Sequence, residues 1–134
     1  LVQENQLQRK ILFKGKFLPG ELDQITQQAY VGINLVEPLG QNQFLSLANK
    51  FFDYIQNAIP QVTMDFPEYK KINDEYEVAL LISDLSVVEI EKSLKSLLED
   101  GNLYNRLTQN CLKAREIYNW QNEEKKLIDF YKQF

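Results

Sequence analysis

The 134-residue chain contains no histidine and a single cysteine, Cys111. Without histidine, the usual zinc sites, a histidine general base and the serine–histidine–aspartate triad are all excluded. One cysteine cannot form a disulfide within the chain. Any catalysis would therefore have to use carboxylates, lysine, tyrosine or backbone dipoles.

The chain also lacks a basic excess and a long apolar run. Its net charge is -4 and its pI is near 4.9, which argues against a nucleic-acid binder and leaves only a local basic patch open. No apolar run approaches the roughly 20 residues that cross a bilayer, and no signal peptide is recognisable. Because residue 1 is Leu1, we expect a fragment or a processed chain that forms one soluble domain over residues 1–134.

Four short apolar runs predict buried strands over residues 11–13, 31–36, 62–64 and 78–82. Between and after them, periodic apolar positions predict helices over 21–29, 46–58, 65–72, 86–99, 103–117 and 120–131. Ser86 and Asn119 are the expected N-caps of the helices over 86–99 and 120–131. Alternation of strands and helices implies βαβ units and a parallel sheet. We therefore predict a three-layer, Rossmann-like α/β domain with about four strands, in which ligands bind beyond the carboxyl ends of the strands.

The chain is organised around residues 46–63, a helix that ends before Pro60 and leads into a strand. Ser46 is the expected N-cap of this helix. Its inward face carries apolar groups, and Asn49, Lys50 and Asp53 share the other face within one turn. Free backbone amides at the helix start could hold a phosphate, although an ordinary capped helix would have the same sequence pattern.

Residues 49–55 read Asn-Lys-Phe-Phe-Asp-Tyr-Ile, and residues 58–62 read Ala-Ile-Pro-Gln-Val. This stretch resembles the donor-site helix in the C-terminal domain of GT-B glycosyltransferases, family 4 in particular, whose members read roughly Pro-Asn-Lys-Leu-Phe-Glu-Tyr-Met and then Gly-x-Pro-Val-Val. Residues 30–36 are similar to the preceding strand of that family, and residues 118–124 to the start of its last helix. The resemblance covers most of the chain.

The resemblance implies a nucleotide-sugar site at the start of this helix. Relatives hold the donor diphosphate on the equivalent amides, which here belong to Ser46, Leu47, Ala48 and Asn49. Asp53 falls at the second acidic position of the family's pair, where relatives usually carry glutamate and bind the ribose. Lys50 could face the phosphates or only solvate the helix.

Two positions depart from the family. Leu45 stands at the first acidic position and cannot hydrogen-bond a sugar. Ala58 replaces the usual glycine, which we interpret as a tight helix end that does not depend on glycine. Loop residues that could replace the missing acid are Glu37, Gln41, Asn42 and Gln43.

Taken together, the residues and the resemblance predict the donor-binding C-terminal part of a GT-B glycosyltransferase. The expected ligand is a nucleotide-sugar, used as a substrate without a cofactor or metal, because no Asp-x-Asp motif is present. The expected partner is the N-terminal acceptor-binding domain of the full-length protein, without which the chain is expected to be inactive. The alternative is a non-catalytic nucleotide-sugar-binding or protein-interaction module. The expected location is cytoplasmic, with peripheral membrane attachment left open.

The last predicted helix is unusually apolar for one buried stripe. Its apolar side chains are Leu127, Ile128, Phe130, Tyr131 and Phe134. This surface could pack on the chain's own sheet, or it could form part of an interface with another domain.

Overall fold

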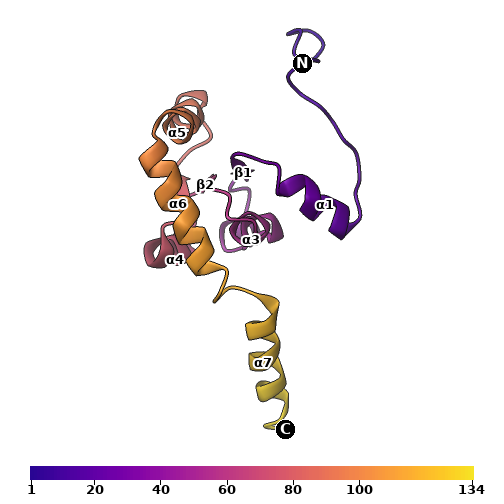
Figure 1. Ribbon diagram of the computed structural model, residues 1–134, viewed down its shortest axis with the longest axis vertical. Coiled ribbons are helices and arrows are strands. Elements are labelled where there is room, and N and C mark those ends of the chain that lie inside the picture. Colours follow the sequence, from indigo (N-terminus) through magenta and orange to yellow (C-terminus); the bar gives the residue numbers. More distant parts are fainter.

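The computed structural model describes all residues from 1 to 134 (Figure 1). Its elements are α1 (Pro19–Thr26), β1 (Gly32–Asn34), α2 (Gln41–Phe44), α3 (Asn49–Gln56), β2 (Gln61–Met64), α4 (Pro67–Tyr76), β3 (Ala79–Ile82), α5 (Val87–Glu99), α6 (Gly101–Ala114) and α7 (Trp120–Tyr131). The chain is therefore an α/β protein with short strands and predominantly helical connections.

The three strands form one parallel sheet in the order β1-β2-β3. Ile33 pairs with Val62, and Val62 pairs with Leu80. Helical connections return the chain to the same end of the sheet each time, so all carboxyl ends of the strands lie together. The predicted parallel sheet between helices is confirmed.

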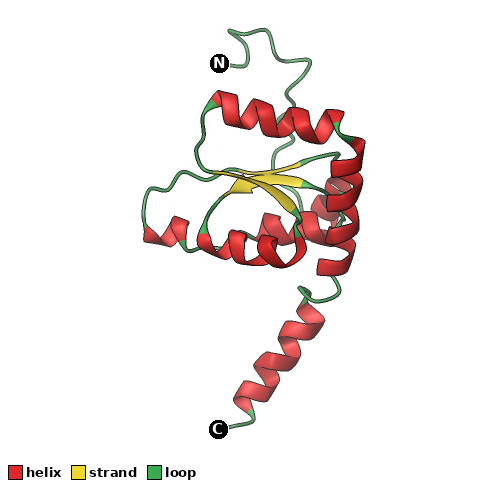
Figure 2. Ribbon diagram, turned by 90° about the vertical axis from the view of Figure 1, so that its left-hand side faces the viewer, coloured by secondary structure: helices red, strands yellow, loops and turns green.

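The predicted fourth strand is absent. Residues 11–13 are irregular, with Leu12 72% and Phe13 84% exposed, and they belong to an extended segment that lies away from the sheet (Figures 1 and 2). An apolar run becomes a strand only when a neighbouring strand accepts its backbone hydrogen bonds. No strand is available there, so β1 remains an edge strand and the sheet has three strands instead of about four.

Helices cover the sheet on both faces. α5 lies on one face, and α3 and α4 lie on the other (Figure 2). α6 crosses the amino ends of the strands, where the Cys111 thiol lies 3.9 Å from the Ile59 carbonyl oxygen and 3.8 Å from that of Val78. The carboxyl ends of the strands therefore stay open for the loops that lead into α3.

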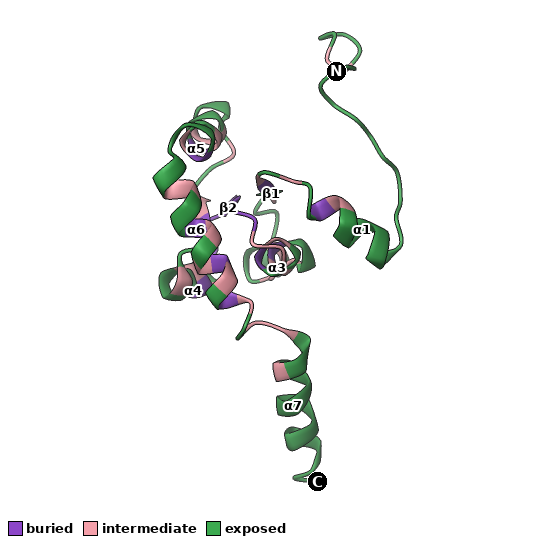
Figure 3. Ribbon diagram, in the orientation of Figure 1, coloured by how far each residue is buried: buried purple, intermediate pink, exposed green.

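The core lies between the sheet and these helices. Phe51 of α3 is fully buried, with its ring 4.9 Å from that of Tyr69 in α4 and 5.6 Å from that of Phe52. All 22 buried residues fall between Thr26 and Ala114, as the purple segments of Figure 3 illustrate. Residues 1–25 and 115–134 contribute no buried side chain.

Several helix boundaries match the sequence pattern. Ser86 caps α5 by accepting a hydrogen bond from the Glu89 amide at 3.3 Å, and Asn119 caps α7 by accepting from the Asn122 amide at 2.9 Å. Both are the caps that the sequence predicts. The predicted strand 31–36 is shorter, because only Gly32–Asn34 pair with β2.

The predicted organising helix is shorter than expected at its start. α3 begins at Asn49 and its N-cap is Ala48, so Ser46 is not the cap. The Ser46 hydroxyl instead donates to the Gln43 carbonyl at 3.0 Å, which closes the short helix α2. At the other end, Ala58 has a φ of 55°, the left-handed conformation that glycine adopts without strain. The helix end is therefore formed without glycine, although in a backbone conformation that glycine adopts most readily.

α7 protrudes from the body of the molecule (Figures 1 and 2). None of its residues is buried, so its apolar side chains do not pack on the sheet. None of the helices combines the length and the apolar character that a membrane span requires.

Candidate functional site

The start of α3 presents backbone amides at the carboxyl edge of the sheet. Ala48 adopts an extended conformation, and its amide donates to the Tyr69 hydroxyl at 3.0 Å. The Ser46 amide donates to the Gln43 carbonyl at 3.4 Å. Of the four amides predicted to hold a diphosphate, only those of Leu47 and Asn49 therefore remain without a partner inside the protein.

The amide of Lys50 is also unpaired, because the first residues of a helix have no carbonyl one turn earlier to bond. Leu47, Asn49 and Lys50 thus form a small platform of free donors, which we call the α3 amide platform. The α3 dipole adds partial positive charge at the same place. Such a platform suits an anion, and no side chain in the structure occupies its donors.

A groove runs along the outer face of α3, beside α1. It encloses a cavity of about 650 Å³, and we call it the α1–α3 groove. Positions one helical turn apart form its two long walls, since such positions share one face of a helix. The α3 wall consists of Asn49, Phe52, Asp53 and Gln56, and the α1 wall of Pro19, Leu22, Asp23 and Thr26.

The joint between α6 and α7 closes one end of the groove. The Gln56 side-chain amide donates to the Tyr118 carbonyl at 2.6 Å, which attaches the joint to α3. Trp120, the only tryptophan, lines the groove and is 64% exposed. Phe17, just before α1, adds a further aromatic ring to the lining.

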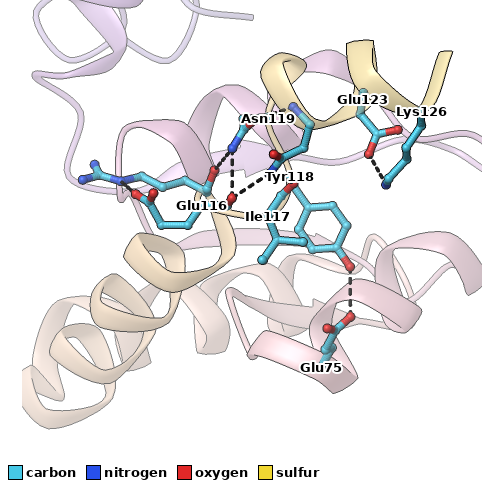
Figure 4. A network of polar contacts seen from close by, with 9 residues as sticks. Glu75, Glu116, Ile117, Tyr118, Asn119, Glu123 and Lys126 are labelled. Carbon is cyan, nitrogen blue, oxygen red and sulfur yellow. Dashed lines mark hydrogen bonds and ion pairs between the residues drawn. The ribbon is translucent and has the colours of Figure 1, made fainter. Parts of the chain in front are cut away.

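A network of polar contacts holds the joint in shape (Figure 4). The Tyr118 hydroxyl donates to the Glu75 carboxylate at 3.0 Å, and its ring packs 6.3 Å from that of Phe52. Removal from water, followed by the hydrogen bond to Glu75, raises the pKa of Tyr118 to about 12. The Asn119 side-chain amide donates to the Arg115 carbonyl at 2.9 Å, so the turn into α7 is bonded internally.

Two aspartates face each other across the groove. Asp23 accepts hydrogen bonds from the side-chain amides of Gln27 at 2.8 Å and Asn57 at 2.9 Å. The Asp53 carboxylate takes part in no hydrogen bond or ion pair within the protein. The pKa of the Asp53 carboxyl is raised, chiefly because the groove removes water from it and secondly because Asp23 carries the same charge. Asp53 is therefore an acceptor free for a ligand.

The structure brings together two of the predicted site residues and separates the others. Asn49 and Asp53 line the groove, and the Asn49 amide also belongs to the α3 amide platform. Lys50 is exposed and does not line the groove. Ser46, Leu47 and Ala48 lie before α3, outside the groove lining.

The loop residues considered as replacements for the acid at Leu45 do not reach the groove. The candidates were Glu37, Gln41, Asn42 and Gln43, and none of them lines it. Leu45 itself is 55% exposed. Tyr54 lies over Gly32 of β1, and its hydroxyl is 3.5 Å from the Ile33 carbonyl, so it covers the sheet edge instead of forming a stacking surface for a ligand.

Sequence reasoning missed the α1 wall of the groove. The helix predicted over residues 21–29 was assigned to no site. The available signal was the spacing of Pro19, Leu22, Asp23 and Thr26, which places a mixed polar and apolar set on one helical face. No group of three or more cysteine, aspartate or glutamate side chains is arranged to hold a metal ion.

No protein-family model matches this chain, and no curated protein matches it either.

Proposed function

We propose that this chain is the nucleotide-sugar-binding, C-terminal domain of a GT-B glycosyltransferase. The observation that carries the proposal is that a set of free hydrogen-bond donors and a free carboxylate acceptor lie next to each other. Free amides of Leu47, Asn49 and Lys50 stand at the carboxyl edge of a parallel sheet, and the unpaired carboxylate of Asp53 follows one turn later on the same helix. The first suits a diphosphate and the second suits adjacent hydroxyl groups.

The charge distribution supports one orientation of the donor. Carboxylates line the groove, so a diphosphate is repelled from its interior and is favoured at the α3 amide platform. The neutral, hydroxyl-bearing part of the donor would then extend towards Asp53. Asn49 would contribute its amide to the first part and its side chain to the second.

Sugar transfer would need more than these residues. The proposed partner is an acceptor-binding N-terminal domain of a full-length protein, and the reaction would occur between the two domains without a metal ion or cofactor. We expect the isolated chain to bind a donor weakly and to transfer no sugar. Detectable transfer by the isolated chain would refute this part of the proposal.

The second candidate function is a non-catalytic module that keeps the same fold. The specific observation in its favour is Leu45, which is 55% exposed at the position where relatives of the resembled family carry an acid. Ala48, whose amide is already bonded to Tyr69, removes one expected phosphate donor and points the same way.

The test is an amide-resolved NMR titration of the chain with UDP, GDP and ADP. We expect the resonances of Leu47, Asn49, Lys50 and Asp53 to shift with one of the three nucleotides. The variant Asp53→Ala should weaken this response. The control Glu99→Ala removes an exposed carboxylate at the end of α5 and should leave it unchanged. No shift with any nucleotide at millimolar concentration would contradict donor binding by this chain.

A further inference from the structure

The α1–α3 groove carries negative charge without a cation in its lining. Asp23, Asp53 and Glu123 contribute carboxylates, and no lysine or arginine is among the lining residues. Glu123 pairs with Lys126 at 2.6 Å, and the nitrogen that neutralises it comes from outside the lining (Figure 4). Asp23 accepts hydrogen bonds only from neutral side-chain amides, and the Asp53 carboxylate accepts no hydrogen bond. The groove therefore attracts positive charge and repels anions.

The same groove is lined by aromatic rings. Phe17, Phe52, Tyr118 and Trp120 come from three separate segments and border the one cavity. The face of an aromatic ring attracts a cation, tryptophan most strongly, and the attraction grows when water is excluded. Trp120 leaves 64% of its surface free, so its ring is accessible to a ligand.

The cavity also has the size of a ligand site. Its volume of about 650 Å³ lies inside the range of roughly 300–1,000 Å³ that small-molecule sites occupy. Apolar groups such as Leu22, which is 46% exposed, would cover the stem of a ligand whose head pairs with a carboxylate.

We propose that the α1–α3 groove binds an organic cation, a guanidinium or ammonium group on an apolar stem, with Asp53 as its ion-pair partner and Trp120 as its aromatic wall. Asp23 adds to the negative potential around the bound cation, whereas the charge of Glu123 is compensated by Lys126. The ligand chemistry is shared by small amines or guanidines and by an exposed arginine or lysine side chain of a peptide.

This site goes beyond the proposed donor site but shares Asp53 with it, so the two are distinguished by Trp120 and by the sign of the ligand's charge. Anion binding depends on the α3 amide platform, whereas cation binding depends on the carboxylates and on Trp120. The two also have separate readouts: a nucleotide shifts the amides of Leu47 to Lys50, and a cation changes the fluorescence of the single tryptophan.

The experiment is a titration of the full chain with pentylguanidine at low ionic strength, followed by Trp120 fluorescence. We expect a saturable change that weakens as salt is added, because screening reduces an accessible ion pair. Pentylurea, which has the same stem and a neutral head, should bind about tenfold more weakly or not at all. Equal binding of the two compounds would overturn the proposal.

Variants assign the ion pair. Asp53→Asn should weaken pentylguanidine binding by about tenfold, whereas Asp53→Glu, which keeps the charge, should retain most of it. The matched control Asp65→Asn removes an exposed carboxylate outside the groove and should have no effect. Unchanged binding in Asp53→Asn would overturn the proposal, and circular dichroism of each variant verifies that it is folded.

A second arm distinguishes the two sources of the ligand. A short glycine–alanine peptide with one central arginine is titrated against the same readout. Tighter binding of the peptide than of pentylguanidine would identify a protein side chain as the better ligand, and weaker binding would identify a free small molecule. If neither the peptide nor pentylguanidine binds, the proposal is contradicted.

Discussion

The middle of the chain and its two ends differ in burial although both are rich in apolar residues. Every buried residue lies between Thr26 and Ala114. Outside that range, Phe13 is 84% exposed and Phe134 is 93% exposed. Figure 3 shows the contrast directly, with buried segments in the body and exposed ends.

Apolar content alone therefore does not bury a segment. The middle contains a sheet whose strands pair with one another, so its helices have a surface to cover. The first 18 residues have no strand partner, and α7 has no layer beneath it. Their apolar side chains therefore have nothing within this chain to pack against.

The largest change in unfolding free energy is expected when a phenylalanine is replaced by alanine in the body, and the same replacement in α7 tests the contrast. Phe51→Ala removes a fully buried ring from the core and should lower the free energy of unfolding by about 3–5 kcal/mol. Phe130→Ala, in α7, removes a ring that is 54% exposed and touches only its neighbours Tyr131 and Phe134 among aromatic rings.

We expect the Phe130 variant to change the unfolding free energy by no more than about 0.5 kcal/mol. Urea unfolding of both variants under identical conditions measures the two values. A loss of unfolding free energy in Phe130→Ala comparable to that in Phe51→Ala would mean that α7 packs on the body in solution.

The next largest effect is expected at β1, the edge strand of the sheet that follows α1. A Cβ atom at Gly32 would lie 2.5 Å from ring atoms of Tyr54, closer than side chains tolerate. Gly32→Ala should therefore lower the unfolding free energy by about 1–3 kcal/mol. Gly101→Ala is the control, because nothing lies within 4 Å of its added methyl group and it occupies the first turn of α6.

The cause can be separated by a double-mutant cycle. If the clash with Tyr54 is responsible, Gly32→Ala should cost less in a Tyr54→Ala background than in the wild type. The same cost in both backgrounds would show that Gly32 is needed for another reason. Urea midpoints of the four proteins supply the measurement.

Much of the body could be predicted from sequence because its signals are local. The spacing of apolar residues and the positions of turn residues located β2, β3 and α5. The capping side chains of Ser86 and Asn119 were correctly assigned. These features depend on neighbours a few residues away. The parallel sheet followed from the alternation of strands and helices.

The errors had two causes: a missing distant partner for one segment, and a local competitor for the predicted partner of another. Residues 11–13 have the composition of a strand, yet no strand in the chain pairs with them. Ser46 has the chemistry of a helix cap, but the carbonyl of Gln43 competes for it.

The candidate site was predicted only in part, because some of its residues are neighbours on one helix and others are far apart in the chain. Asn49 and Asp53 lie on one helix, so their proximity followed from helical spacing. Asp23 and Trp120 come from opposite ends of the chain, and only packing brings them to the same groove. The charge of the groove was therefore invisible before the fold was known.

The smallest expected effect lies on the boundary between the body and the N-terminal segment, where Asp53 faces Asp23. Because the pKa of Asp53 is raised above its ordinary value of 3.8, the folded chain holds this proton more tightly than the unfolded chain. As pH rises above 3.8, the unfolded state loses its proton first, so this group lowers stability through the window up to its folded pKa. Asp53→Asn removes the effect and should stabilise the chain at pH 7 by at most about 0.5 kcal/mol, since the site is partly open to solvent.

Urea unfolding at pH 3 and pH 7 provides the comparison, and the gain should vanish at the lower pH, where both states of the wild type are protonated. An equal gain at both pH values would mean that it arises from packing, and a loss at pH 7 would mean that α1 does not lie beside α3 in solution.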